Sequence, residues 1–224
     1  MIQDIIKYGE AEVTYKNKQL LSQKPKLKNL FWETTLRCNA YCKHCGSRAG
    51  GNVNFEDELT TEEIKKALQE IADKYDAREI LINVTGGEPL LRKDLFEVME
   101  FAHNLGYYWG MTTNGILIND DIIEKMKKTG MSTISISLDG LEKSHDEFRQ
   151  VKGSYSKIIE NVKKLKTANF LNYLQITTVV NKSNIHELPE LYNEIQSLQI
   201  NSWRILNMEP IGRTADNQDL LLNG

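Results

Sequence analysis

Apolar and β-branched residues recur along most of the chain in short runs, and the segments between them have the apolar spacing of helices. From Leu30 onward we predict six strands, at residues 30–35, 79–84, 107–113, 133–138, 174–180 and 202–207. The intervening segments carry apolar residues three and four positions apart, which is the spacing of an amphipathic helix. The pattern therefore predicts a regular alternation of strands and helices.

The ends of the predicted helices carry capping residues. Thr60 and Glu63 form a capping box before the first helix, and Asn119 is suited to begin the third. Gly106 and Gly130 stand just past the ends of the second and third helices. The last two helices are marked by the apolar residues Tyr155, Ile158, Ile159, Val162 and Leu165, and by Leu188, Leu191, Ile195 and Leu198.

This alternation predicts a parallel sheet, because each parallel connection needs a crossover that a helix usually supplies. Six strands fall short of the eight that close a full barrel. Periodicity alone leaves a barrel and an open doubly wound sheet as alternatives, and in both of them ligands bind at the carboxyl ends of the strands. Residues 1–29 are polar and weakly patterned. We interpret them as an N-terminal accessory segment with one short helix.

The amino-acid composition limits the classes of protein to which this chain can belong. The 224 residues are 40% hydrophobic and 26% charged, which fits one large domain or a small pair of domains. A net charge of -3 with interspersed Lys and Glu argues against a nucleic-acid partner. No apolar run approaches the ~20 residues of a membrane span, and the N-terminus lacks the apolar core of a signal peptide. We therefore expect a cytoplasmic protein with no membrane partner.

The three cysteines of the chain, Cys38, Cys42 and Cys45, all lie within the stretch "RCNAYCKHC". An odd, clustered set argues against a disulfide framework and for metal ligation or thiol chemistry. Thiolates three and two residues apart are typical of loops that ligate iron–sulfur clusters. Three thiolates would leave one iron of a four-iron cluster open for chemistry. The alternatives are a structural zinc site completed by His44 and a set of structural or reactive thiols.

Small polar residues also follow the other predicted strands. They form the stretches "TGGEP" (85–89), "TTNG" (112–115), "SLDG" (137–140) and "VVNKSN" (179–184). Taken alone, "TTNG" and "SLDG" are typical of ordinary turns, and "TGGEP" of a strand-to-helix turn with Pro89 in the first helical turn. Their shared position at one rim of the sheet, together with the cysteines, predicts a binding site there.

The stretch "CNAYCKHC" matches the CxxxCxxC signature of the radical S-adenosylmethionine (SAM) enzymes, and "TGGEP", "SLDG" and "HDEFR" (145–149) resemble that superfamily too. With "EPIGR" (209–213), the sequence is most similar to the branch that carries a C-terminal SPASM or twitch extension. The resemblance implies an α/β fold, a partial (β/α)6 TIM-like barrel over residues 30–213. Residues 214–224 would then be a C-terminal tail, which either begins a missing extension or ends a compact member without auxiliary clusters.

The resemblance also implies roles for individual residues. Cys38, Cys42 and Cys45 would ligate a [4Fe-4S] cluster, and SAM would bind its fourth iron. The implied cofactor-binding residues are His44, Thr85, Gly86, Gly87, Glu88, Thr113, Ser137, Arg149 and Asn181, with Pro210 a further candidate. The two glycines would let the amino group of SAM approach the backbone. Ser137 would lie near its carboxylate or ribose, and His44 beside its adenine. No catalytic residues beyond the cluster ligands are expected.

The implied chemistry is a one-electron cleavage of SAM to methionine and a 5′-deoxyadenosyl radical, which abstracts hydrogen from a substrate. The branch leads us to expect a maturase acting on a peptide or protein side chain, with a reductant such as flavodoxin or ferredoxin. The alternative is a non-catalytic iron–sulfur or zinc module on the same fold. Intact "TGGEP" and "SLDG" favour the enzyme, because a module that only held metal would need no nucleoside pocket.

Overall fold

The structure is a computed structural model, and it describes residues 12–16, 18–20, 22, 25–51 and 58–222. Its centre is one six-stranded sheet with the order β1-β2-β3-β4-β5-β6, in which every neighbouring pair is parallel. The strands are β1 (Asn29–Glu33), β2 (Leu81–Thr85), β3 (Tyr108–Thr113), β4 (Met131–Ser137), β5 (Tyr173–Val180) and β6 (Ser202–Asn207). All six predicted strands are confirmed.

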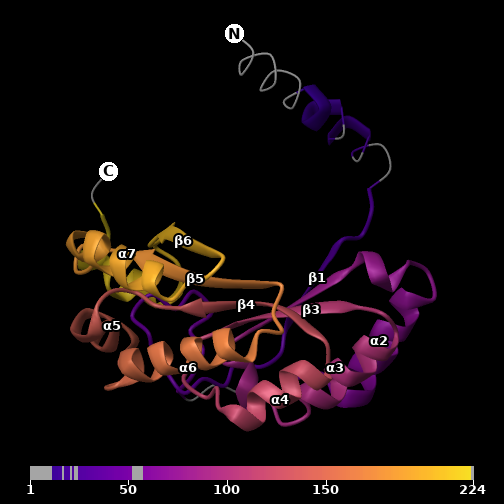
Figure 1. The fold of residues 1–224 in the computed structure, drawn as a ribbon. Coiled ribbons are helices and arrows are strands. Elements are labelled where there is room, and N and C mark those ends of the chain that lie inside the picture. Colours follow the sequence, from indigo (N-terminus) through magenta and orange to yellow (C-terminus); the bar gives the residue numbers. More distant parts are fainter. Residues whose placement is uncertain (1–11, 17, 21, 23–24, 52–57, 223–224) are drawn as a thin grey trace.

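The strand order decides between the two architectures that periodicity left open. A doubly wound sheet reverses its strand order partway, whereas here each strand pairs with the next one in the chain. Within the described residues, β1 and β6 are not hydrogen-bonded to each other, so the sheet curves without closing (Figure 1). The expected partial (β/α)6 barrel is confirmed.

Five helices correspond to the predicted ones: α2 (Thr61–Ala72), α3 (Leu95–Asn104), α4 (Asp120–Lys128), α6 (Ser154–Ala168) and α7 (Leu188–Ser197). The capping box before α2 is formed, since Thr60 accepts a hydrogen bond from the Glu63 backbone and donates its own backbone N–H to the Glu63 carboxylate. Short 3₁₀ helices occupy η1 (Ala77–Glu79), η2 (Pro89–Leu91), η3 (Ile185–Glu187), η4 (Gly212–Asp216) and η5 (Gln218–Leu220). Pro89 therefore does begin a helical turn after "TGGEP".

The helix α5 (Glu142–Arg149) was not predicted as a helix, although it contains the "HDEFR" stretch. Its sequence, EKSHDEFR, offers a single apolar residue, so it lacks the apolar stripe on which helix prediction depends. Its buried residues are His145, Phe148 and Arg149. This helix is held by polar and aromatic contacts.

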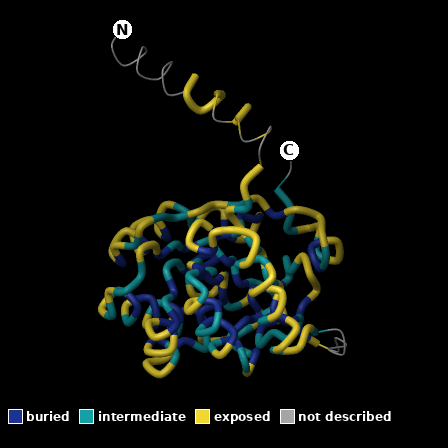
Figure 2. Tube along the Cα trace, turned by 90° about the vertical axis from the view of Figure 1, so that its right-hand side faces the viewer, coloured by how far each residue is buried: buried dark blue, intermediate teal, exposed yellow. Residues whose placement is uncertain are grey.

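The two faces of the sheet differ in chemistry. Burial alternates along β2 and β5, as expected for strands with one buried face. Side chains such as Ile82, Trp109, Ile136 and Ile176 are fully buried against the helices that cover the outer face (Figures 1 and 2). The opposite, concave face carries mostly polar side chains, such as Asn83, Ser135 and Gln175, together with the aromatic residues Phe31 and Tyr173. The helices thus leave one polar surface of the sheet open inside the barrel.

The two ends of the described chain lie differently relative to the barrel. Residues 12–16 and 18–20 are helical and exposed, in a segment that stands away from the barrel (Figure 2). At the other end, η4 and η5 run back over the barrel, where the backbone N–H of Lys182 donates to the carbonyl of Leu220 at 2.9 Å. The boundary expected at residue 213 falls inside η4. No helix in the described ranges has the length and apolar character needed to cross a membrane.

Candidate functional site

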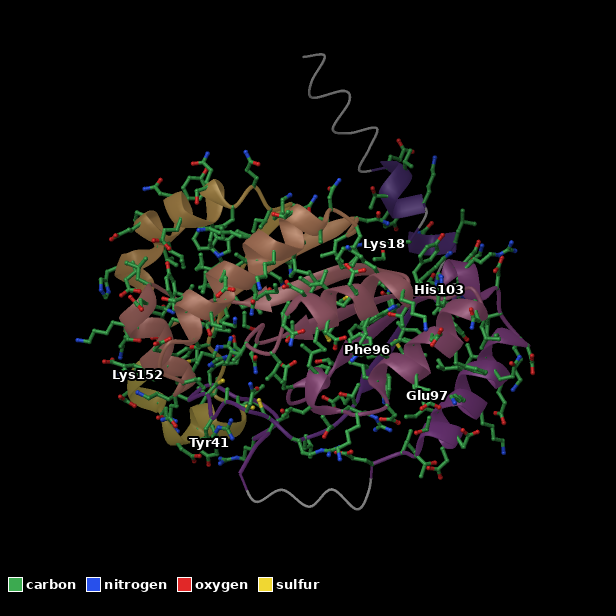
Figure 3. The ribbon with its side chains drawn as sticks, turned by 60° about the horizontal axis from the view of Figure 1, so that its bottom comes forward. Lys18, Tyr41, Phe96, Glu97, His103 and Lys152 are labelled. Atoms are coloured by element: carbon green, nitrogen blue, oxygen red, sulfur yellow. The ribbon has the colours of Figure 1, made fainter. Side chains whose placement is uncertain are left out.

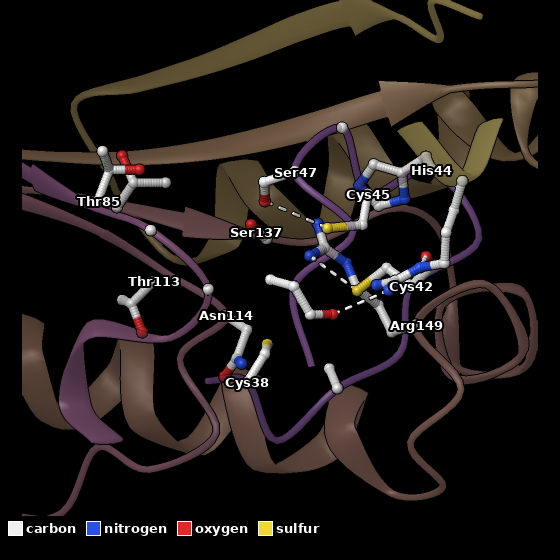
Figure 4. Close-up of a pocket in the computed structure, with 17 residues that line it drawn as sticks. Cys38, Cys42, His44, Cys45, Ser47, Thr85, Thr113, Asn114, Ser137 and Arg149 are labelled. Atoms are coloured by element: carbon white, nitrogen blue, oxygen red, sulfur yellow. Dashed lines mark hydrogen bonds between the residues drawn. The ribbon is translucent and has the colours of Figure 1, made fainter. Parts of the chain in front are cut away.

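The loop that follows β1 brings all three cysteine thiols to one cavity of about 220 Å³ (Figure 4). All three are free thiols, and Cys42 is buried. The loop is fixed by backbone hydrogen bonds from Gly50 to the carbonyl of Leu36 at 2.8 Å and from Lys43 to the carbonyl of Phe148 at 3.0 Å. The thiols therefore project from a loop that is anchored at both ends.

The remaining walls of this cavity come from the carboxyl ends of β2, β3 and β4 and from α5. Among the predicted site residues, those that line it are Cys38, Cys42, His44, Cys45, Thr85, Gly86, Gly87, Thr113, Ser137 and Arg149. Residues far apart in the sequence thus meet at one rim, as parallel strands require. Glu88, Asn181 and Pro210 are not among the residues that line the cavity.

The glycines of "TGGEP" make room for protein backbone. A Cβ atom on Gly86 would lie 2.6 Å from the carbonyl oxygen of Thr35, and one on Gly87 would collide with the carbonyl of Arg37. The segment is also hydrogen-bonded there, from Gly87 N–H to Thr35 at 2.7 Å and from Glu88 N–H to Arg37 at 2.8 Å. These glycines therefore let the segment pack against the start of the cysteine loop, and their close approach to SAM stays a prediction.

We expect Gly87→Ala to destabilise the protein by about 1–3 kcal/mol, the usual cost of forcing atoms into a filled space. The added methyl would displace the Arg37 carbonyl and so shift the cysteine loop. Gly46→Ala is the matched control, because a Cβ at Gly46 has its nearest neighbour, Ile211 Cγ2, at 4.0 Å. Unfolding in denaturant measures both variants. Equal free energies of unfolding for the two would contradict this assignment.

Glu88 lies beneath the cavity and joins two strand ends. Its fully buried carboxylate accepts hydrogen bonds from Thr113 Oγ1 at 2.8 Å and from the backbone N–H groups of Asn114 at 2.9 Å and Leu90 at 3.2 Å. Burial raises the pKa of this carboxyl group, although these donors oppose the shift. Its side chain acts here as a brace between the "TGGEP" and "TTNG" segments.

Asn181 follows β5 and organises its own turn. Its Oδ1 accepts from the backbone N–H of Ser183 at 2.8 Å, and its own N–H donates to Asn184 Oδ1 at 2.8 Å. The side chain of Asn184 in turn donates to the carbonyl of Asp139 at 2.7 Å. Asn181 thus acts on the site through the "SLDG" turn.

A buried arginine connects the cysteine loop with the "SLDG" segment. Arg149 donates from Nη1 to the Sγ of Cys42 at 3.6 Å and from Nε to Asp139 at 2.5 Å. Burial alone would raise the pKa of Asp139, but the charge of Arg149, together with the nearby histidines and the backbone N–H of Val179, holds that pKa below its usual value. A hydrogen bond to a ligand sulfur is one of the contacts that tune iron–sulfur centres. The fold thus places a fixed cation against one of the three thiols.

His44 is a neutral aromatic ring in this site. It stacks on Phe148 with ring centroids 4.4 Å apart and an angle of 10° between the planes. Burial, followed by the charge of Arg149, lowers the pKa of His44 to about 4, so the imidazole is uncharged at neutral pH. Its Nδ1 is buried and has no hydrogen-bond partner among the described residues.

Among the residues that line the cavity but were not predicted, Asn114 and Arg213 hold the cysteine loop. Asn114, in the stretch that is typical of a turn, donates to Asn39 Oδ1 in the cysteine loop at 2.7 Å. Arg213 is buried and donates to the carbonyl oxygens of Cys42 and Ala49, both at 2.8 Å. Its guanidinium also lies 4.0 Å from the ring centroid of Tyr41, which Figure 3 shows beside the ribbon of the C-terminal segment. The sequence signal for Arg213 is its place in "EPIGR", a stretch that indicated only a branch of the superfamily and no role in the site.

The donor groups can be compared with two kinds of metal centre, a single zinc ion and an iron–sulfur cluster. In the described part of the chain, no three Cys, His, Asp or Glu side chains are placed to hold a single metal ion. The three thiols instead line the walls of one cavity, and the imidazole of His44 stacks on Phe148. Three thiols around a shared space are the donor set of an iron–sulfur cluster with an open position. A zinc site completed by His44 stays the alternative, because His44 lines the same cavity as the three thiols.

Comparison with known proteins agrees with this geometry. The family model of the Radical SAM superfamily matches residues 32–195. Over 221 residues the chain is 31% identical to the Fe-coproporphyrin III synthase of Methanosarcina barkeri, covering 98% of this chain and 54% of that protein. It is 30% identical to the mycofactocin maturase MftC of Mycolicibacterium smegmatis, covering 85% of this chain and 47% of that one. The chain thus spans about half the length of these curated relatives.

Solved structures show the same fold. The crystal structure of Streptococcus suis SuiB bound to S-adenosylmethionine superposes with a TM-score of 0.70 at 19% identity, over 90% of this chain and 46% of that chain. At this identity the likeness concerns the fold alone. The family model covers most of the barrel, including the cysteine loop and the four strands after it. The chain belongs to the Radical SAM superfamily.

Proposed function

We propose that this chain forms the core of an enzyme that cleaves SAM reductively and uses the resulting radical to abstract hydrogen from a substrate. The observation that carries the proposal is the cavity lined by all three cysteines, by Thr85, Gly86 and Gly87, and by Ser137. The superfamily uses a [4Fe-4S] cluster and SAM. These residues offer both a thiol set and an adjoining polar wall for a nucleoside.

We assign the cluster to Cys38, Cys42 and Cys45. When bound, the cluster and SAM supply a one-electron cleavage that yields methionine and a 5′-deoxyadenosyl radical. Arg149 contributes a hydrogen bond to the sulfur of Cys42, and Asp139 fixes the direction of that guanidinium.

The SAM pocket is assigned to the adjoining walls. Thr85, Gly86 and Gly87 form one wall and Ser137 another, and His44 offers the uncharged ring that an adenine can stack on. Thr113 also lines this cavity, and its side chain is held by a hydrogen bond to the buried carboxylate of Glu88. The cavity is partly enclosed by the cysteine loop and the segment around Arg213, which limits the access of water to the reacting groups.

For the substrate we propose a peptide or protein side chain. Support comes from relatives: one is named a mycofactocin maturase, and SuiB has been solved bound to its precursor peptide. A second candidate is a tetrapyrrole, because other relatives are named AdoMet-dependent heme synthases. We further propose a cytoplasmic location and a flavodoxin or ferredoxin as reductant, which suits free thiols that must stay reduced.

Anaerobic loading with iron and sulfide tests the proposed function. We expect a brown protein with about four iron atoms per chain. SAM should change the electron paramagnetic resonance spectrum of the reduced cluster, and a strong reductant should then yield 5′-deoxyadenosine. A colourless protein that takes up one zinc ion would overturn the cluster. A cluster whose electron paramagnetic resonance spectrum does not change when SAM is added would support a non-catalytic module instead.

A further inference from the structure

A second hollow opens on the concave face of the sheet, beside the cysteine cavity. Its volume is about 320 Å³, at the lower end of the range for small-molecule sites. It is lined by side chains from β1 to β6, among them Asn83, Thr112, Ser135, Tyr173, Gln175 and Arg204. Thr85 and Thr112 line both spaces. A molecule in this hollow, which we call the barrel hollow, therefore lies next to the site proposed for SAM.

Two polar side chains of the barrel hollow, Gln175 and Ser135, are hydrogen-bonded to each other and to neighbouring side chains. Gln175 donates from Nε2 to the hydroxyl oxygens of Ser135 and Thr177, both at 3.1 Å, and its Oε1 accepts from Ser202 at 3.2 Å. The hydroxyls of Ser135 and Thr177 are also hydrogen-bonded to each other at 2.8 Å. This row of side chains is already paired and offers little to a charged ligand.

Arg204 differs from this row. It is the one charged residue among the described side chains that line the barrel hollow, and no described acidic side chain forms an ion pair with it. It is exposed, so its guanidinium keeps all its donors available. A guanidinium with free donors is suited to a carboxylate, which it can bind through two parallel hydrogen bonds.

The register of the sheet places Arg204 near the cavity that is lined by the cysteines. Arg204 is level with Thr177, and Thr177 is level with Ser137, which lines the cysteine cavity. Neighbouring strands lie ~4.8 Å apart, so Arg204 and Ser137 are separated by roughly 10 Å along the sheet. A ligand held at Arg204 needs only a few bonds to reach the neighbouring cavity.

Two aromatic side chains complete the barrel hollow. Phe31 on β1 and Tyr173 on β5 line it, and their exposed fractions of 72% and 43% are large for aromatic residues on strands. Exposed aromatic surface beside a cation suits a ligand with an apolar or flat body and an anionic end.

From this juxtaposition we propose that the barrel hollow binds the substrate through a carboxylate held by Arg204, with the apolar part of the substrate against Phe31 and Tyr173. This inference rests on the proposed function for its reaction, but not for the binding itself. The carboxylate belongs either to a peptide or to a small molecule such as a tetrapyrrole with propionate side chains. Both sources present the same group to Arg204.

Binding of matched probe pairs tests the proposal in the 224-residue chain, before and after iron loading. One pair is a tetrapeptide that ends in phenylalanine, as the free acid and as the C-terminal amide. The other pair is coproporphyrin III and its tetramethyl ester. We expect the acid of at least one pair to bind about tenfold more tightly than its neutral counterpart, the scale of a charged hydrogen bond. The pair that shows this preference identifies the source of the carboxylate.

Arg204→Gln should abolish that preference, and Arg204→Lys should retain part of it. Arg78→Gln is the matched control, because Arg78 is exposed outside the barrel hollow and paired with Asp76. The proposal is overturned if neither acid is preferred, or if the preference survives in Arg204→Gln. Binding is measured without iron as well. Failure to load a cluster would therefore count against the proposed function, and the preference for the acid could still be interpreted.

Discussion

Alanine in place of Cys38, Cys42 or Cys45 is expected to leave the chain unable to hold its iron. The sequence contains no other cysteine, so no thiolate can replace the one that is removed. Iron and sulfide content after anaerobic loading should fall from about four atoms per chain to near zero, and 5′-deoxyadenosine formation should cease with it. This is the largest effect we expect from any single substitution.

Ser47→Ala is the control for these variants, because Ser47 lies in the same loop and contacts the Sγ of Cys45 at 3.6 Å. It should load iron like the parent chain. Full iron content in all three cysteine variants would show that the loop does not hold the cluster. A loss in the serine variant of the same size would point to general damage to the loop.

Arg213→Ala is expected to destabilise the protein by about 3 kcal/mol and to reduce iron loading. Its buried guanidinium donates to the carbonyl oxygens of Cys42 and Ala49, and each hydrogen bond from a charged group is worth about 1.5–3 kcal/mol. Without it, the carbonyl of Ala49 loses its partner, and the carbonyl of Cys42 keeps only the backbone N–H of Cys45 at 3.3 Å. Denaturant unfolding gives the stability, and iron analysis gives the consequence for the loop.

Arg48→Ala provides the comparison, because Arg48 joins the same two segments through Asp216 and the carbonyl of Gly212 but is exposed. Exposed ion pairs contribute little, so this variant should lose much less stability. If both arginine variants unfolded alike, burial of Arg213 would not be the reason for its effect.

The repeating parts of the fold could be predicted from the sequence because each depends on local pattern. Strands such as β5 show their alternation directly, and the residues Thr60 and Asn119 identify helix starts by their own chemistry. The cysteine spacing likewise lies within eight positions. The rim position of the remaining residues followed from the rule that parallel strands end at one edge.

The rest depends on contacts between distant segments, and no local pattern encodes these. The ion pair of Arg149 with Asp139 depends on how α5 is placed beside the end of β4. The helix α5 has no apolar stripe, so its position could not be predicted from the sequence. Arg213 reaches a loop that lies 171 positions earlier. The close packing at Gly87 could not be predicted either, because the atoms that exclude a side chain there belong to Arg37, fifty positions earlier.

The anchoring of the cysteine loop by Arg213 has a consequence for the order of events during synthesis. A ribosome adds about 5–20 residues per second, so the 171 positions between Cys42 and Arg213 correspond to roughly 10 to 30 seconds of translation. Throughout that interval the carbonyl groups of Cys42 and Ala49 lack their final donor, and Cys45 lacks the backbone N–H of Arg213. The nascent thiols therefore lie on an unfinished loop, and iron can reach the mature geometry only after Arg213 has been synthesised.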